Sequence, residues 1–186
     1  MVNTIKPVLE ILHEYSVVEL RLNRPSTLNA INPAMYNELA RLLDEHSQGG
    51  EIRAIVLTAS GPSFTAGLDI QAAREDLQVI LRSARNFMHV LMRCRCIVIA
   101  GVYGLVTAIG VTLLLHCDIV FAHPDSTFTT QFYLLGIVPE FSSSALFPKL
   151  LGPALTSRLL FQGHSVPAHE FVQRGVLQFL DERQKK

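Results

Sequence analysis

The chain has 186 residues, of which 49% are hydrophobic and 17% charged, a composition typical of a globular protein rather than a disordered segment. Its 16 basic and 16 acidic residues cancel, so the charge balance gives no argument for nucleic acid or an anionic membrane surface as a partner. Three cysteines in apolar surroundings do not predict a disulfide framework, and neither they nor the seven histidines show the spacing of a metal site.

The predicted elements begin with a strand at residues 17–23, which is followed by a turn rich in Pro, Ser and Asn. Asn32 is a good helix cap and Pro33 suits the first helical position. A helix is therefore expected from there to the glycines at 49 and 50, which end it.

The remaining predicted elements alternate between strands and helices. In chain order they are a strand at 52–59, a helix at 76–93, a strand at 97–102, a helix at 105–116, a strand at 118–122, a short extended segment at 127–130 and two helical segments near 142–162 and 167–174. Such alternation predicts βα units with right-handed crossovers and a largely parallel sheet. No boundary is evident, so one α/β domain over residues 1–186 is expected.

One uncharged stretch, residues 96–115, is long enough to span a bilayer. Its first part is β-branched and ends in glycines at 101 and 104, and a helix-compatible run follows. A buried strand, a turn and a buried helix explain the same residues, so no membrane span is expected.

Carboxylates are scarce in the second half of the chain. Between Asp76 and Glu170 the only ones are Asp118, Asp125 and Glu140. Asp118 begins a strand, where a buried structural hydrogen-bonding role is expected, and Asp125 lies in a turn. Glu140 follows a proline and precedes a phenylalanine and three serines, an apolar setting in which a carboxylate usually has a partner or a task. Two readings stay open: a cap of the helix that the serines begin, or a catalytic base.

Two glycine-containing turns follow predicted buried strands, "TAGLDI" and "GLVTAIGV". A tight turn of this kind can leave backbone N–H groups pointing at a ligand oxygen. On neighbouring parallel strands, two such turns can form a two-donor oxyanion hole. Neither is a Walker A or dinucleotide-binding signature, so the sequence does not predict standard nucleotide binding.

Five motifs occur in the order typical of the crotonase superfamily, the enoyl-CoA hydratases and isomerases, and the chain resembles that family from about residue 8 to residue 176. They are "VELRLNRPSTLNAIN", "IVLTASGPSFTAGLDI", "CIVIAGVYGLVTAIGVTLLLHCDIVFA", "STFTTQFYLLGIVPEFSSSALFPKLLG" and "LLFQGHSVPAHEFVQRGV". The resemblance implies the crotonase-like ββα-superhelix, a spiral of repeated units. Related enzymes continue with further helices, so a C-terminal helical region is expected to be missing from these 186 residues.

The resemblance also implies a site. Members of the family hold the thioester carbonyl of an acyl-CoA between two backbone N–H groups, which match those of Leu68 and Ile109. The expected substrate-binding residues, carried over from the same motifs, are Arg24, Ala30, Ala66, Gly67, Asp69 and Ile70.

The acids of the family separate one reaction from another. Hydratases use two glutamates, and the matching positions hold Thr112 and Phe132, which argues against hydration. The peroxisomal type of Δ3,Δ2-enoyl-CoA isomerase places its glutamate later, in a "PEG"-like word followed by serines. Here that word is "PEFSSS", so the resemblance implies an isomerase with Glu140 as its catalytic residue. Phe141 stands where the family prefers glycine.

The resemblance implies no cofactor and no metal, because coenzyme A arrives as part of the substrate, and it implies a homotrimer or hexamer. The alternative is a non-catalytic acyl-CoA-binding or oligomerisation module of the same fold. The sequence shows no targeting signal; an intracellular protein is expected, with a peroxisome or mitochondrion both open as the compartment.

Overall fold

The computed structural model describes residues 6–180 and contains two sheets. The strands are β1 (Val8–His13), β2 (Val17–Leu22), β3 (Ala54–Ala59), β4 (Ile97–Val102), β5 (Leu105–Thr107), β6 (Ile119–Ala122), β7 (Thr127–Thr129), β8 (Val166–Pro167) and β9 (Gln178–Phe179). The larger sheet has the order β1-β2-β3-β4-β6-β9 and the smaller one the order β5-β7-β8. All neighbours are parallel except β1 with β2 and β7 with β8, so the largely parallel sheet is confirmed.

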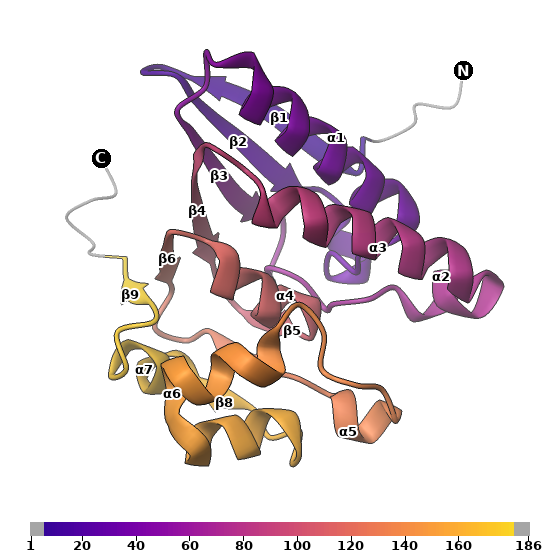
Figure 1. Cartoon of the computed structure of the whole chain (residues 1–186), viewed down its shortest axis with the longest axis vertical. Coiled ribbons are helices and arrows are strands. Elements are labelled where there is room, and N and C mark those ends of the chain that lie inside the picture. Colours follow the sequence, from indigo (N-terminus) through magenta and orange to yellow (C-terminus); the bar gives the residue numbers. More distant parts are fainter. Residues whose placement is uncertain (1–5, 181–186) are drawn as a thin grey trace.

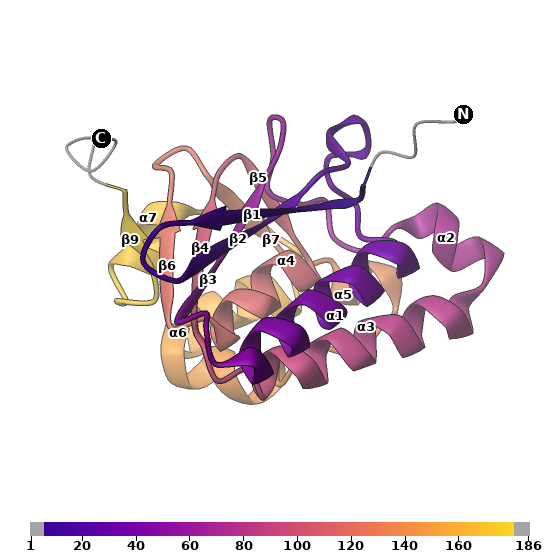
Figure 2. The same cartoon turned by 90° about the horizontal axis from the view of Figure 1, so that it is seen from above.

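The helices connect these strands. They are η1 (Pro25–Thr27), α1 (Pro33–Gly49), α2 (Ile70–Glu75), α3 (Leu77–Met92), α4 (Ile109–Thr112), η2 (Leu113–His116), α5 (Phe132–Leu135), α6 (Ser143–Leu160) and α7 (Ala168–Val172). In Figures 1 and 2, α1 and α3 run side by side on one face of the larger sheet, while α6 and α7 gather around β8 at the other end of the molecule. The mixed α/β architecture agrees with the α/β class that the sequence predicts.

Local sequence signals set the boundaries of the two long helices in this first half. The Asn32 side chain accepts a hydrogen bond from the Met35 N–H at 3.0 Å, and Pro33 occupies the first position of α1. Asp76 caps α3 in the same way, by accepting from the Val79 N–H at 3.0 Å. Both helices bury their apolar faces in the core, as the helical spacing predicts.

The segment 105–116, predicted as one helix, is different in the structure. Its first three residues form β5, which pairs with β7, and the helix begins only at Ile109 and continues as the 3-10 turn η2. The apolar run carried no period that separates a buried strand from a buried helix, and pairing with distant residues decided the outcome. Among the described residues, no helix is both long and apolar enough to cross a membrane.

The sequence also left several short elements without a prediction: β1, α2, α5, β8 and β9. The expected helix at 142–162 is present as α6, but Gly152 has φ +76° and ψ 167° and breaks it into two pieces. Pro153 then takes an early position in the second piece, where a missing N–H does least harm.

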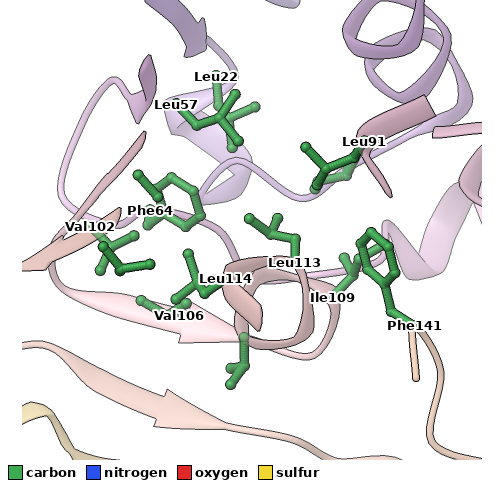
Figure 3. Close-up of a cluster of buried hydrophobic side chains, with 14 of the residues drawn as sticks. Leu22, Leu57, Phe64, Leu91, Val102, Val106, Ile109, Leu113, Leu114 and Phe141 are labelled. Carbon is green, nitrogen blue, oxygen red and sulfur yellow. The ribbon is translucent and has the colours of Figure 1, made fainter. Parts of the chain in front are cut away.

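The core lies between the larger sheet and the helices that cover it. Figure 3 shows part of it, where Phe64, Val102 and Val106 meet Leu113 and Leu114. The η2 turn therefore stands against the strands, and this packing fixes α4 and the loop before it.

Candidate active site

The two glycine-containing turns lie in contact at the ends of their strands. Thr65 and Val106 form a parallel bridge, and the Thr107 N–H donates to the Thr65 carbonyl at 3.0 Å. Gly67 has φ +87°, and a Cβ placed on it would lie 3.0 Å from the Ala108 Cβ. Ala108 itself has φ +50°, a backbone conformation that usually requires glycine. The two turns therefore lie side by side, as expected from the sequence for turns that follow neighbouring strands.

Each turn carries one N–H group that is available to a ligand. Among the described residues, neither the Leu68 N–H nor the Ile109 N–H donates to a protein acceptor. The neighbouring groups are occupied: Asp69 N–H donates to Ile31 O at 3.1 Å, and Ala108 N–H donates to Thr129 O at 2.9 Å. The backbone is therefore anchored directly after Leu68 and directly before Ile109, the two expected oxyanion donors.

Glu140 lies beside the first turn of α4, which begins at Ile109. The Thr112 hydroxyl, three residues further along that helix, donates to Glu140 Oε1 at 2.6 Å. Glu140 is partly buried. Burial raises the pKa of the Glu140 carboxyl from an ordinary 4.5 to about 7, although the hydrogen bond from Thr112 opposes the shift. A carboxyl with this pKa can both accept and return a proton near neutral pH.

The Glu140 side chain does not cap α6, which was one of the two readings of the sequence. Within residues 6–180, no side-chain hydrogen bond caps this helix. It is the main-chain carbonyl of Glu140 that contacts the helix start, by accepting from the Ser143 N–H at 3.0 Å and the Ser143 hydroxyl at 2.6 Å. The Glu140 carboxylate instead accepts the hydrogen bond from the Thr112 hydroxyl.

Phe141, at the position where the family prefers glycine, occupies the left-handed region at φ +54°. Its ring stacks on the His116 ring with centroids 4.1 Å apart, and His116 Nε2 donates to the Phe141 carbonyl at 2.8 Å. Figure 3 shows the same ring beside Ile109. We interpret these contacts as the compensation for an unfavourable backbone angle, because strained φ values persist only where the surroundings hold them.

The expected substrate-binding residues fall into two neighbouring segments. Arg24 Nη1 donates to the Ala30 carbonyl at 2.6 Å and to Asp69 Oδ2 at 2.8 Å. The Ala66 N–H donates to Leu28 O at 2.8 Å. The loops that follow β2 and β3 are therefore joined by an ion pair and backbone hydrogen bonds, and Ile70 stands exposed at the start of α2.

Asp69 has a structural role in addition to the expected one. Its Oδ1 accepts from the N–H groups of Gln71 and Ala72, both at 3.1 Å, so it caps α2. Burial alone would raise the pKa of Asp69, but the hydrogen bonds from Arg24 and the Ala72 N–H outweigh burial and lower it. Its charge is thus committed to Arg24 and to the helix.

Three side chains around Glu140 escaped the sequence reasoning in this role: Thr112, His116 and Tyr36. Thr112 was noted only as a position without an acid, and the contact spans 28 residues of sequence. Tyr36 is buried in α1, and the charge of Glu140 contributes to raising its pKa. The only sequence signal for these three residues was that each is polar at a helical position expected to face the core.

Other acids and cavities lie elsewhere. Asp118 accepts from the Val98 N–H at 2.8 Å, which confirms its predicted hydrogen-bonding role, although the residue is exposed rather than buried. A cavity of about 350 Å³ is lined by Thr58, Tyr103 and His123 among others, and Glu140 is not part of it. In the part of the chain that the structure describes, no group of three His, Cys, Asp or Glu side chains could hold a metal ion.

The fold and the paired turns define this chain as a protein of the crotonase class. The sequence profile of the Enoyl-CoA hydratase/isomerase family matches residues 13–184, and the chain belongs to that family. A probable enoyl-CoA hydratase of Rhodobacter capsulatus is 32% identical over 162 residues, which are 85% of this chain and 62% of that protein. Human enoyl-CoA delta isomerase 2 is 32% identical over 180 residues, which are 91% of this chain and 45% of that protein.

Solved structures agree with the fold. An enoyl-CoA hydratase/isomerase from Pseudoalteromonas atlantica superposes with a TM-score of 0.88 and 32% identity, covering 96% of this chain and 71% of that one. A putative enoyl-CoA hydratase/carnithine racemase from Magnetospirillum magneticum gives 0.87 and 31%, covering 95% and 70%. The chain thus spans about half to two thirds of the curated relatives and about 70% of these structures.

Proposed function

We propose that this protein is a Δ3,Δ2-enoyl-CoA isomerase, which moves a double bond in fatty acyl-CoA thioesters, with Glu140 as its proton carrier. The observation that carries the proposal is the Glu140 carboxyl itself. Its pKa is raised to about 7, and it accepts a hydrogen bond from Thr112. Thr112 lies on α4, whose first N–H group, that of Ile109, donates to no acceptor among the described residues. One of the relatives reported above is an enoyl-CoA delta isomerase.

The mechanism needs one carboxylate. Ionised Glu140 removes a proton from C2 of a 3-enoyl-CoA, and the electron pair of that C–H bond spreads over a dienolate that ends at the thioester oxygen. The N–H groups of Leu68 and Ile109 stabilise the negative charge on this oxygen. Glu140 then returns the proton to C4, which leaves the double bond between C2 and C3. No water is consumed and no other group is oxidised or reduced.

The side chains around Glu140 favour isomerisation over hydration. By family resemblance, hydration uses two glutamates that flank one water, and the matching positions here are Thr112 and Phe132. Phe132 is 2% exposed and carries no ionisable group, while Thr112 uses its hydroxyl to hold Glu140. A single acid of near-neutral pKa suits a reaction that takes and returns one proton.

The rest of the proposal concerns binding. The joined loops of Arg24 to Ala30 and Ala66 to Ile70 form the side along which the acyl-CoA would lie. Coenzyme A enters as part of the substrate, and we propose no further cofactor. The assembly proposed from the family resemblance is a homotrimer or hexamer.

The test is to incubate purified protein with a 3-enoyl-CoA and to follow the conjugated 2-enoyl thioester by its absorbance. We expect turnover whose rate rises with pH through about 7, because the base must be ionised. Glu140→Gln keeps the shape and loses the proton carrier, so its rate should fall at least a hundred-fold, a typical loss for general acid–base catalysis. Asp125→Asn, in an exposed turn, is the matched control.

Equal rates for wild type and Glu140→Gln would remove Glu140 from the mechanism. Binding of acyl-CoA without turnover would favour the non-catalytic module, and hydration of a 2-enoyl-CoA would contradict the preference for isomerisation.

A further inference from the structure

Tyr36 carries a buried hydroxyl without a hydrogen-bond partner in residues 6–180. The residue lies in α1 at 0% exposure, and among the described residues its hydroxyl is the one buried side-chain polar atom that lacks a hydrogen-bond partner. Tyr103 shows the usual situation, because its hydroxyl donates to the Ala59 carbonyl at 2.6 Å. Burying an unpaired hydroxyl is unfavourable, so an orphan group of this kind calls for an explanation.

The surroundings of Tyr36 lead to the Glu140 loop. Its ring centroid is 5.8 Å from that of Phe87 on α3, and the Phe87 centroid is 6.3 Å from that of Phe141. Phe141 directly follows Glu140 in the chain. The phenol therefore belongs to the same buried aromatic cluster that supports the candidate catalytic residue.

The two groups also interact electrostatically. Burial raises the pKa of the Tyr36 hydroxyl well above its ordinary value, and the charge of Glu140 raises it further. The phenol consequently stays protonated and remains a hydrogen-bond donor over the working pH range. On the acceptor side, Thr112 donates to Oε1 of Glu140, and within residues 6–180 no group donates to Oε2.

We propose that Tyr36 is a positioning residue of the Glu140 site, which stabilises the ionised carboxylate through one bridging water molecule that accepts from the Tyr36 hydroxyl and donates toward Oε2. A carboxylate offers about four lone-pair directions, so Thr112 and the bridging water together leave room for the substrate proton. The catalytic role of this contact rests on the proposed isomerase function. The existence of the contact between Tyr36 and Glu140 does not depend on that function.

The recorded neighbours of this site come from three elements. From α1 the titratable neighbour is Tyr36, from η2 it is His116, and α3 contributes the apolar Phe87. His116 is turned to the Phe141 carbonyl, 2.8 Å from its Nε2. A probe on the Glu140 carboxyl carbon reports the protonation of that group alone.

The experiment follows the carboxyl carbons of the full chain, labelled with ¹³C in glutamate, through a pH titration by NMR. Glu140 is assigned by the signal that disappears in Glu140→Gln. Tyr36→Phe should raise the pKa of Glu140 by about one unit, since the bridging water loses its anchor and the ionised carboxylate loses a hydrogen bond. Tyr103→Phe, which removes a satisfied hydroxyl outside this cluster, should leave the titration unchanged.

The same variants give a kinetic and a stability readout. With the pKa one unit higher, the rate of Tyr36→Phe at pH 7 should fall about five-fold and recover at pH 9, while KM stays the same. Tyr36→Phe should unfold like wild type at pH 5, where Glu140 is protonated in the fold, and more easily at pH 9, where the buried carboxylate has lost a hydrogen bond. Tyr103→Phe should unfold more easily, because it loses a hydrogen bond.

An unchanged Glu140 titration in Tyr36→Phe overturns the proposed contact, whatever the activity. A shifted titration in a protein without isomerase activity supports the contact and overturns the proposed reaction instead. A loss of rate in Tyr36→Phe that is the same at every pH, with no shift in the titration, assigns Tyr36 to packing alone and overturns the proposal.

Discussion

At the scale of the residue, the fold buries the Glu140 carboxyl, and this burial destabilises the protein when the group is ionised. Its pKa rises from 4.5 in an ordinary setting to about 7 in the fold, because burial disfavours the charged form. The folded chain therefore binds this proton more tightly than the unfolded chain. The resulting contribution to the free energy of unfolding is fully present below pH 4.5 and is lost as the pH rises through about 7.

This predicts that Glu140→Gln stabilises the protein in a pH-dependent way. Glutamine resembles the protonated acid in shape and charge and can still accept from Thr112, so the variant avoids the cost of burying a charge. Thermal unfolding should show a melting temperature a few degrees above that of wild type at pH 8.5, with little difference at pH 4.5. A difference of the same size at both values would contradict the raised pKa.

At the scale of the element, the turn after β3 depends on a conformation that only glycine adopts freely. Gly67→Ala keeps φ near +87° and brings the new Cβ to 3.0 Å from both the Ala108 Cβ and the Thr107 carbonyl oxygen. Its free energy of unfolding should fall by about 1–3 kcal/mol, a typical cost for a strained backbone conformation. The rate of the proposed isomerisation should fall with it, because any relief of the strain moves the Leu68 N–H, the proposed oxyanion donor.

Gly49→Ala is the matched control for this turn, with no atom within 4 Å of its new Cβ. It lies at the end of α1 and should be neutral or add about 0.4–1 kcal/mol to the free energy of unfolding by restricting the unfolded chain. Chemical denaturation of both variants measures the difference. Equal stabilities would mean that the turn tolerates a side chain.

The elements also show how far the sequence predicts the fold. The two helices with explicit caps, at Asn32 and Asp76, were predictable because the signals lie within a few residues of the boundary. The strand β5 was not predictable, because its identity comes from pairing with β7 and with Thr65, both distant in sequence. Local patterns contain no information on such partners.

The candidate site divides in the same way. The scarcity of acids and the family resemblance singled out Glu140, and the two turns were visible as glycine-containing loops after strands. The hydroxyl of Thr112 and the phenol of Tyr36 became relevant only in three dimensions, because α4 and α1 carry them to the Glu140 loop. Phe141 was recognisable as a departure, but its stacking on His116 was not.

At the scale of the whole molecule, charge and apolar surface favour association. The formal net charge is zero at pH 7, so little repulsion keeps copies of the chain apart. Five exposed apolar side chains lie within or directly after α5: Tyr133, Leu134, Leu135, Ile137 and Val138. Clusters of this kind are more often covered by a partner than single exposed residues are.

We therefore predict that the native particle is larger than one chain of 20.6 kDa, with three or six copies as the family resemblance implies. Light scattering coupled to size exclusion would measure its mass. Val138 is 81% exposed within the α5 cluster, and Val138→Asp should shift the mass toward a single chain because an interface would have to bury the new charge. Leu12→Asp, at a residue 68% exposed on β1, should not. A wild-type mass of one chain at every concentration would contradict the assembly, and equal dissociation by both variants would remove α5 from the interface.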